Sequence, residues 1–313
     1  MTDPLEFRLV DAFALSPYSG NVAGVILEAD GLAENQMQAI ATEFNAPETA
    51  FILKPTTRDA AVRIRWFTPG CEVDFCGHAT LAAVHALLES GRFAREAAEP
   101  ATILPLESKS GILTVRTENQ TDPEKPYTIW LDMPHCEPKP DPVNVPTVAK
   151  HLGLDPAMLD DRLPPIRTHD DDLILAVSEL STLMELRPRM NELSHYCARN
   201  RIRGVFVTTT QALSAATVVQ SRFFAPAFGV DEDPVTGSAH GPLGLHLFNN
   251  GIVQPVNGRA DFLCAQAKAG GRAGVVRVVV TESTEGAKSV RIGGSCITTA
   301  TGTLTKIPKS AAV

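Results

Sequence analysis

Hydrophobic positions along the first part of the chain recur with two different spacings. Alternation at every second position predicts strands over residues 7–13, 22–28, 49–53 and 61–69. Between residues 30 and 45, Leu32, Met37, Ile40 and Phe44 recur at the spacing of one helix face, with Asn45 as a stop. Residues 80–91 are apolar at nearly every position, so we expect a helix that is buried on most sides.

The second half of the chain repeats this order of elements. The pattern predicts a helix and a strand over residues 193–209, a strand over 217–226 and a helix over 238–251. When residues 67–91 are aligned with 224–251, the following pairs coincide after a short insertion: Phe67 with Phe224, Pro69 with Pro226, Gly77 with Gly237, Ala79 with Ala239, and Gly91 with Gly251. In this register Cys76 faces Thr236, His78 faces Ser238 and Glu48 faces Arg203.

This register predicts an internal duplication and therefore two similar domains. We expect them at residues 1–120 and 127–313, divided within the polar stretch 117–128, with the last strand able to cross back to the first domain. Matching loops of two related domains would then meet at one cleft, which is a usual place for a small-molecule site. Chance similarity between two strand–loop–helix units is the alternative.

Composition narrows the class of protein. The 313 residues are 44% hydrophobic and 20% charged, as in folded globular proteins, and the formal net charge is −8. The lack of a Lys/Arg run argues against a nucleic-acid or anionic-membrane partner. The six cysteines are scattered without CxxC spacing, which favours reduced thiols. With no signal peptide and no apolar stretch of membrane-spanning length, we expect a cytoplasmic protein.

Two loops that open helices carry the polar residues of interest, FCGHATL at 75–81 and DEDPVTGSAHG at 231–241. The first N–H groups of a helix lack intrahelical partners and carry partial positive charge, and glycine lets a ligand approach them. Gly77 and Gly237 therefore predict an anion site that suits a carboxylate. The alternative is that Gly77, Thr236 or Ser238 only caps its helix.

Three side chains are candidates for acid–base chemistry. Glu48 stands at a helix-to-strand joint among apolar neighbours, which can raise the pKa of a carboxyl group, although a solvated loop glutamate is the alternative. His78 could carry a proton, donate a hydrogen bond to a substrate or only open the helix. Asp233 precedes a proline and could orient His78 or a substrate amine, whereas Asp231 and Glu232 are expected in solvent.

Metal and nucleotide motifs are missing from the sequence. The spacing of Cys71, Cys76 and His78 matches no standard zinc pattern, and no second cluster completes four ligands. Neither GxGxxG nor GxxxxGK[ST] occurs. We therefore expect no metal and no cofactor.

Four motifs, in order along nearly the whole chain, resemble the phenazine-biosynthesis PhzF-like isomerases. They are DAFALSPYSGNVAGVIL, EFNAPETAF, RIRWFTPGCEVDFCGHATLAA and DEDPVTGSAHGPL. The resemblance implies an α+β fold like that of diaminopimelate epimerase, with two similar domains, each a curled mixed or antiparallel sheet around a central helix, and the active site between them. It also implies a homodimer that isomerises a small carboxylate-bearing metabolite without cofactor or metal.

The resemblance also implies roles for individual residues. Glu48, His78, Asp233 and Ser238 stand at the catalytic positions of the family motifs. Gly77 and Gly237 would supply backbone donors, Asn21 would line the pocket, and Cys76 and Thr236 would complete the substrate-binding set. In the implied reaction Glu48 takes a proton from one carbon and returns a proton to another.

Related epimerases use two opposed cysteines, each of which stands just before a glycine. Here Cys76 has that position in the first half, but Thr236, or Val235 in another alignment, stands at the matching position. Racemisation by two thiols is therefore disfavoured. An amino-acid epimerase, racemase or dehydratase that uses Cys76 alone is the alternative enzyme, and a binding protein without turnover is the third hypothesis.

Overall fold

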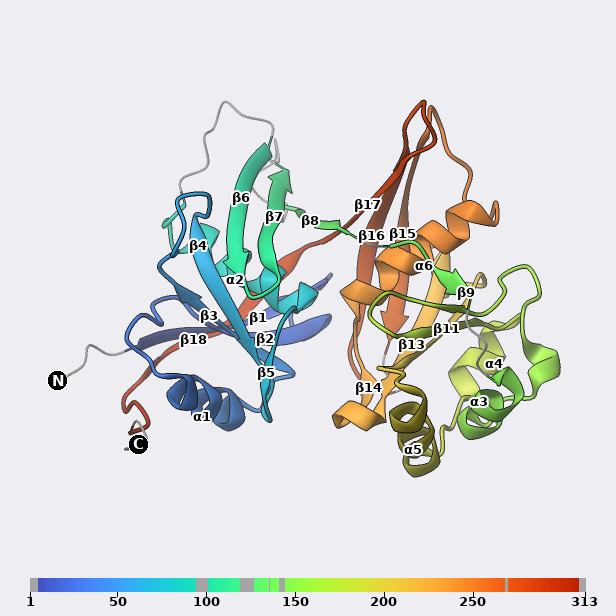
Figure 1. Cartoon of the computed structure of the whole chain (residues 1–313), viewed down its shortest axis with the longest axis horizontal. Coiled ribbons are helices and arrows are strands. Elements are labelled where there is room, and N and C mark those ends of the chain that lie inside the picture. Colours follow the sequence, from blue (N-terminus) through green and yellow to red (C-terminus); the bar gives the residue numbers. More distant parts are fainter. Residues whose placement is uncertain are drawn as a thin grey trace. The chain divides into compact units, whose positions relative to one another are not determined.

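The computed structural model describes residues 5–93, 101–118, 127–134, 136–140, 144–267 and 270–309. The chain divides into two compact units (Figure 1). The first unit consists of Met1–Asp132 and Gly293–Val313, and the second consists of Met133–Ile292. The last strand thus belongs to the first unit, whereas the predicted junction at 117–128 lies mostly outside the described residues.

The first unit is a mixed sheet with two helices. Its strands are β1 (Leu5–Ala12), β2 (Asn21–Ile26), β3 (Glu48–Leu53), β4 (Val62–Phe67), β5 (Glu72–Val73), β6 (Ala101–Ser108), β7 (Gly111–Glu118), β8 (Ile129–Met133) and β18 (Cys296–Leu304). Strand β1 is antiparallel to both β2 and β18. The pairs β2–β3 and β4–β6 are parallel, whereas β3–β4, β4–β5, β6–β7 and β7–β8 are antiparallel.

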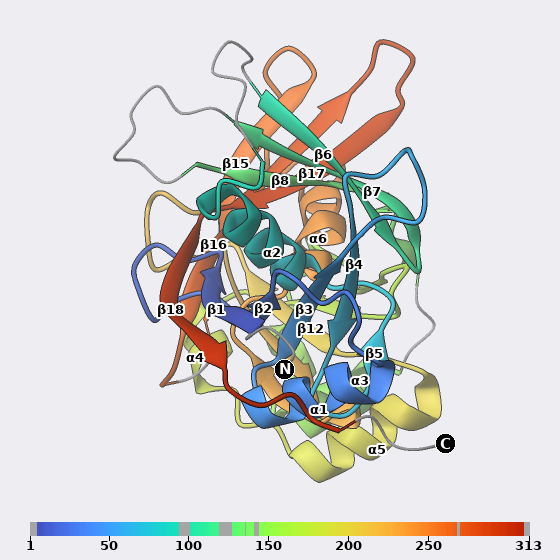
Figure 2. The ribbon, with the colours of Figure 1, turned by 90° about the vertical axis from the view of Figure 1, so that its left-hand side faces the viewer.

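Helix α2 (Gly77–Glu89) forms the centre of the first unit (Figure 2). Every residue from Gly77 to Leu87 is buried, and the helix contacts β1, β2, β3 and β18. The prediction of a helix buried on most sides is therefore confirmed. Helix α1 (Glu34–Phe44) instead packs one apolar face on β2, β3 and β4, and it ends at Asn45, whose φ of 50° closes the helix in the left-handed region.

The second unit has the same order and pairing of strands. Its strands are β9 (Lys139–Pro140), β10 (Ile166–Arg167), β11 (Leu173–Ala176), β12 (Val205–Thr209), β13 (Val219–Ala225), β14 (Val230–Asp233), β15 (Arg259–Ala267), β16 (Ala273–Glu282) and β17 (Lys288–Gly294). The pairs β11–β12 and β13–β15 are parallel, whereas β12–β13, β13–β14 and β15–β16 are antiparallel. The strands from β2 to β7 thus match those from β11 to β16, one for one.

Helices complete the match between the units. Helix α6 (Gly237–Asn249) has 13 residues, as α2 does, and is buried without a break from Gly237 to Leu247. Where the first unit has α1, the second has α4 (Leu180–Glu185) and α5 (Met190–Asn200); α3 (Val145–Leu152) precedes them. Short 3₁₀ turns span Pro156–Met158 and Pro226–Phe228. In the described part of the chain, every helix is too short or too polar to cross a membrane.

Candidate active site

The first unit brings Glu48 to the beginning of helix α2. The chain turns after α1 at Asn45 and enters β3 at Glu48, which lies opposite Ala23 in the parallel ladder with β2. Cys76 is the N-cap residue of α2, so His78 is the second residue of that helix. Oε2 of Glu48 lies 3.2 Å from Nε2 of His78.

His78 is buried, whereas the Glu48 side chain is 20% exposed and so remains accessible. Burial lowers the pKa of His78 to about 4, although a hydrogen bond to the Val22 backbone opposes this shift. The ring is therefore neutral near pH 7 and carries one N–H group. The contact with Glu48 falls short of regular hydrogen-bond geometry, so Nε2 has no hydrogen-bond partner among the described residues. The two atoms are nevertheless close enough for a proton to pass between them.

Cys76 adds a third donor atom to this pair. Its thiol sulfur lies 3.5 Å from Nδ1 of His78. One ligand atom from each of Glu48, Cys76 and His78 lies within 4.8 Å of the others, and zinc accepts all three ligand types. The spacing argument could not find this trio because Glu48 comes from another strand, while Cys71 is exposed and is not in the group. The expected absence of a metal stays a prediction.

Asn21 is buried at the first residue of β2, next to Val22. Because β2 runs parallel to β3 with Ala23 opposite Glu48, Asn21 lies at the strand end from which Glu48 starts. The residues of the first half of the predicted set are thus gathered around one end of β2, β3 and α2.

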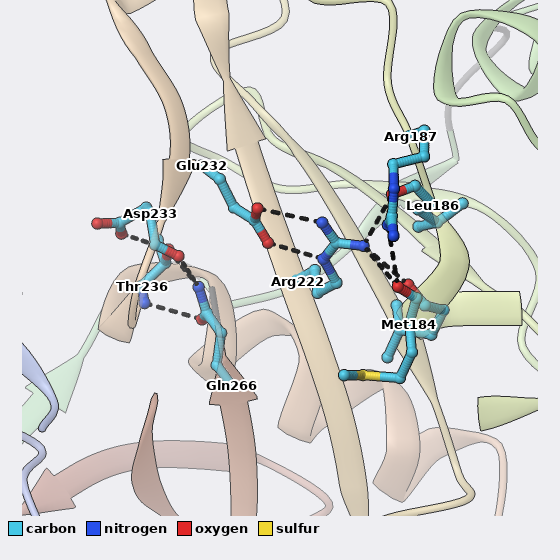
Figure 3. A network of polar contacts seen from close by, with 9 residues as sticks. Met184, Leu186, Arg187, Arg222, Glu232, Asp233, Thr236 and Gln266 are labelled. Carbon is cyan, nitrogen blue, oxygen red and sulfur yellow. Dashed lines mark hydrogen bonds and ion pairs between the residues drawn. The ribbon is translucent and has the colours of Figure 1, made fainter. Parts of the chain in front are cut away.

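In the second unit, Asp233 and Thr236 form a fixed loop before α6 (Figure 3). The Thr236 hydroxyl donates to Oδ2 of Asp233 at 2.6 Å. Gln266, fully buried on β15, accepts from the Thr236 N–H at 2.8 Å and donates to the Asp233 carbonyl at 2.8 Å. Gln266 was not found from the sequence, because its strand is distant along the chain and carries no motif.

Neither helix start is capped by its own N-cap side chain. Cys76 and Thr236 both make no side-chain cap hydrogen bond. At the fourth residue after each cap, a side chain instead binds the cap carbonyl: the Thr80 hydroxyl at 2.6 Å and Nδ1 of His240 at 2.8 Å. The alternative in which the Thr236 side chain caps α6 is therefore wrong, and a role for the two helix starts as anion sites stays a prediction.

Ser238 is the second residue of α6, as His78 is of α2, and it is buried. Its hydroxyl oxygen accepts a hydrogen bond from Nη2 of Arg203 at 2.9 Å. Arg203 in turn binds the carboxylate of Asp172, with Nε donating to Oδ1 at 2.8 Å. Arg203 appeared in the sequence only as the residue matching Glu48, and Asp172 was not found.

Glu232 corrects one expectation from the sequence. Asp231 is exposed, as predicted, but Glu232 is buried and paired with Arg222, with Nε–Oε1 at 2.7 Å and Nη2–Oε2 at 3.1 Å (Figure 3). Successive residues of β14 point to opposite faces, which puts Glu232 inside. The guanidinium of Arg222 also donates to the Leu183 and Leu186 carbonyls at the end of α4, at 3.0 and 3.1 Å. This buried network holds β13, β14 and α4 together.

The structure therefore gathers the predicted residues into two clusters. Glu48, His78, Cys76, Gly77 and Asn21 lie together in the first unit. The cluster of the second unit consists of Asp233, Thr236, Gly237 and Ser238. That the two clusters serve one reaction stays a prediction.

Comparison with known proteins agrees with the motifs. The family model described as phenazine biosynthesis-like protein, PhzC-PhzF, matches residues 10–302. An uncharacterized isomerase of Clostridium acetobutylicum is 31% identical over 297 residues, which cover 92% of this chain and 94% of the relative.

Solved structures show the same fold. A phenazine biosynthesis protein of the PhzF family from Bacillus anthracis superposes with a TM-score of 0.85 at 26% identity, covering 97% of this chain and 100% of that chain. A hydroxyproline epimerase from Agrobacterium vitis shares the fold alone, with a TM-score of 0.54 at 14% identity over 97% of this chain and 93% of that chain. With an epimerase-like fold and a family model matched over nearly its whole length, the chain belongs to the phenazine biosynthesis-like, PhzF-type family of isomerases.

Proposed function

We propose that the protein is a cofactor-independent isomerase that moves a proton between two carbons of a small, carboxylate-bearing metabolite. The contact of Glu48 with His78, 3.2 Å between Oε2 and Nε2, is the observation that carries the proposal. The carboxyl group is partly exposed and can reach a substrate, while the buried neutral ring can hold or return a proton. A general acid–base group needs this combination of access and a proton partner.

Glu48 is assigned the proton transfer. Its carboxylate removes a proton from one carbon of the substrate and, as the acid, returns a proton to another carbon. The substrate is rearranged without net oxidation, so the step balances without an electron acceptor. His78 is assigned to orient the Glu48 carboxyl group and to share its proton, because the buried Nε2 atom lies 3.2 Å from Oε2 of Glu48 and has no hydrogen-bond partner among the described residues.

The helix starts are assigned the recognition of the substrate. Gly77 and Gly237 begin α2 and α6, and the N–H groups there favour an anion. Ser238 is proposed as a hydroxyl donor to the substrate carboxylate. Asp233 and Thr236, locked together by their 2.6 Å hydrogen bond, are proposed to fix the loop that presents Gly237 and Ser238.

Glu48→Gln tests the proton transfer. The amide keeps the shape of the side chain but cannot act as a base, and general acid–base groups contribute roughly 10²- to 10⁴-fold to rates. We expect deuterium uptake from heavy water, screened over small amino and hydroxy acids, to fall by at least about 10²-fold. Glu43→Gln, at an exposed position of α1, is the matched control and should leave exchange unchanged.

Two outcomes would contradict this assignment. Unchanged exchange in Glu48→Gln, with a normal unfolding curve, removes the role of Glu48. Loss of exchange on treatment of the native enzyme with a chelator, restored by Zn²⁺, would instead assign Glu48, Cys76 and His78 to a metal site. The assay is therefore run before and after chelation.

The Cys76 thiol, 3.5 Å from Nδ1 of His78, favours a second candidate function. A neighbouring imidazole can activate a thiol as a base. In that case the enzyme is an amino-acid epimerase or a dehydratase in which Cys76 takes the proton. Substitution of Cys76 separates the two candidates.

A further inference from the structure

The internal duplication extends from the order of the elements to their side-chain contacts. In the first unit, Glu48 at the start of β3 contacts His78, the second residue of α2. In the second unit, Arg203, two residues before β12, contacts Ser238, the second residue of α6. Places that correspond to within one residue of the strand register thus hold a carboxylate and an imidazole in the first unit, and a guanidinium and a hydroxyl in the second.

The chemistry of the second pair fixes the direction of its hydrogen bond. A guanidinium group has only donors, so the Ser238 oxygen must accept from Nη2 of Arg203 at 2.9 Å. The hydroxyl proton of Ser238 then points elsewhere. Among the described residues no acceptor takes that proton, and Ser238 is 8% exposed at the start of α6. A buried hydroxyl with its proton unclaimed calls for a ligand that accepts hydrogen bonds.

Arg203 is held rigidly in this orientation. The guanidinium binds both oxygens of Asp172, which is fully buried. The backbone adds two further ties, from the Arg203 N–H to the Asp171 carbonyl and from the Leu173 N–H to the Gly204 carbonyl, both 2.9 Å. The bidentate ion pair with Asp172 fixes the guanidinium, and the two backbone hydrogen bonds fix the main chain that carries it. The Arg203 side chain therefore has little conformational freedom.

Arg203 stays charged in this setting. Burial by itself would lower the pKa of Arg203, but the attraction of Asp172 and the hydrogen bonds to it raise that pKa above the ordinary value. The Arg203 side chain is 31% exposed and also borders a cavity of about 430 Å³. Asp170 and Asp171 line that cavity and would repel an anion, so the side of Arg203 that faces Ser238 is the side suited to an anion.

We propose that Arg203 is the positioning residue of the second unit, which acts through Ser238 to make the start of α6 specific for the carboxylate form of the substrate. It holds the Ser238 oxygen so that the hydroxyl proton is offered to the ligand. This inference rests on the proposed function, since it names the group that recognises the carboxylate of the same substrate. A neutral amide of the same acid would gain far less from this donor.

Binding of acid and amide pairs tests the inference separately from catalysis. All variants are made in the Glu48→Gln background, and binding of benzoate, lactate and prolinate is compared by calorimetry with that of benzamide, lactamide and prolinamide. Arg203→Lys keeps the charge but loses the fork that holds both Asp172 and Ser238. We expect it to weaken acid binding about tenfold, because the hydroxyl of Ser238 is no longer held toward the charged carboxylate, and to leave amide binding within about twofold.

A double-mutant cycle shows whether Arg203 acts through Ser238. Ser238→Ala should weaken acid binding as Arg203→Lys does, and the double variant should be no weaker than either single variant. Arg199→Lys, at an exposed position of α5, is the matched control and should change nothing. Where Arg203→Lys does not fold, the charge-free pair Arg203→Met with Asp172→Leu replaces it.

The outcomes are distinct. An unchanged acid-to-amide ratio in Arg203→Lys with reduced stability, or additive losses in the double variant, overturns the positioning role. The positioning role is also overturned if none of the three acids binds to the Glu48→Gln protein. Normal deuterium exchange in Glu48→Gln overturns the proposed function instead and leaves the binding result intact.

Discussion

At the scale of single residues, Cys76 is held against a histidine and not against a second thiol. The other cysteines differ in reactivity: Cys71 is exposed, whereas burial raises the pKa of Cys136 to about 12 and of Cys197 to about 11. Burial likewise raises the pKa of Cys264 and Cys296. Thiol reagents at neutral pH are therefore expected to react first with the exposed Cys71.

Cys76→Ser separates the isomerase proposal from its thiol alternative. A serine hydroxyl can still contact Nδ1 of His78 but is far too weak an acid to act as a thiolate base. If Glu48 is the base, deuterium exchange should stay within about threefold of the native value. A loss of about 10²-fold or more, with Cys71→Ser unaffected, would assign the proton transfer to Cys76.

The motifs locate side chains, but they do not reveal the partners of those side chains. Glu48, His78, Asp233 and Ser238 could be named because short local patterns carry them. Their partners, such as Arg203 and Gln266, come from other strands, where nothing in the local pattern marks them. Glu232 illustrates the opposite error. A run of acidic residues predicts a solvent-exposed loop, and only the strand β14, whose successive residues face opposite sides, shows that Glu232 is buried.

At the scale of elements, two buried helices determine how tightly each unit packs. Helix α6 contains Gly241, Pro242 and Gly244 and still runs unbroken for 13 residues. A Cβ atom at Gly244 would lie 2.4 Å from Cγ1 of Val278 on β16. Glycine is therefore required here for the close approach of helix and strand, although it weakens an isolated helix.

Gly244→Ala tests this close approach by the sign of its effect. In an exposed helix the change would stabilise by about 1 kcal/mol, but overpacking a core typically costs 1–3 kcal/mol. We expect the free energy of unfolding, measured with urea, to fall by about 1–2 kcal/mol. Added stability would show that Val278 can move aside.

A second substitution identifies the contact. Val278→Ala removes the methyl groups that Gly244→Ala meets, so the double variant should recover part of the lost stability relative to the sum of the single variants. Gly70→Ala, where a new Cβ would lie 3.9 Å from Oγ1 of Thr68, should have little effect.

Elements with a long periodic pattern could be predicted from sequence, and short ones could not. The strands and helices on either side of the two marked loops agree with the pattern in type and order. Between residues 92 and 192 the pattern named no element, yet β6, β7, β11, α3 and α4 occur there. Strands of two residues, such as β9 and β10, are too short for any period to appear, and tertiary pairing alone defines them.

At the scale of the whole molecule, both units place a neutral histidine in a buried helix start. His78 lies in α2 and His240 in α6, and burial lowers the pKa of each to about 4. Burial also lowers the pKa of His246. Each unit therefore contains a buried histidine with a lowered pKa. We expect the free energy of unfolding of each unit to depend on pH.

The sign of the response follows from proton binding. In the unfolded chain these histidines titrate near pH 6.5, whereas in the folded chain they stay neutral down to about pH 4. The unfolded state therefore binds more protons in this range, and stability falls as the pH drops from about 6.5 towards 4. Carboxylates with a lowered pKa, such as Glu89 at about 2, lose their contribution only at lower pH.

Urea unfolding at pH 7.5 and pH 5 checks this prediction. We expect the free energy of unfolding to fall by roughly 2 kcal/mol for each such histidine over this range. His240→Gln is the informative variant, because its amide N–H can replace the hydrogen bond from Nδ1 to the Thr236 carbonyl and does not titrate. The variant should lose the part of the pH dependence that comes from His240 and retain the part that comes from His78. An equal pH dependence in native protein and variant would show that His240 is already charged in the folded state at pH 5, against the effect of its burial.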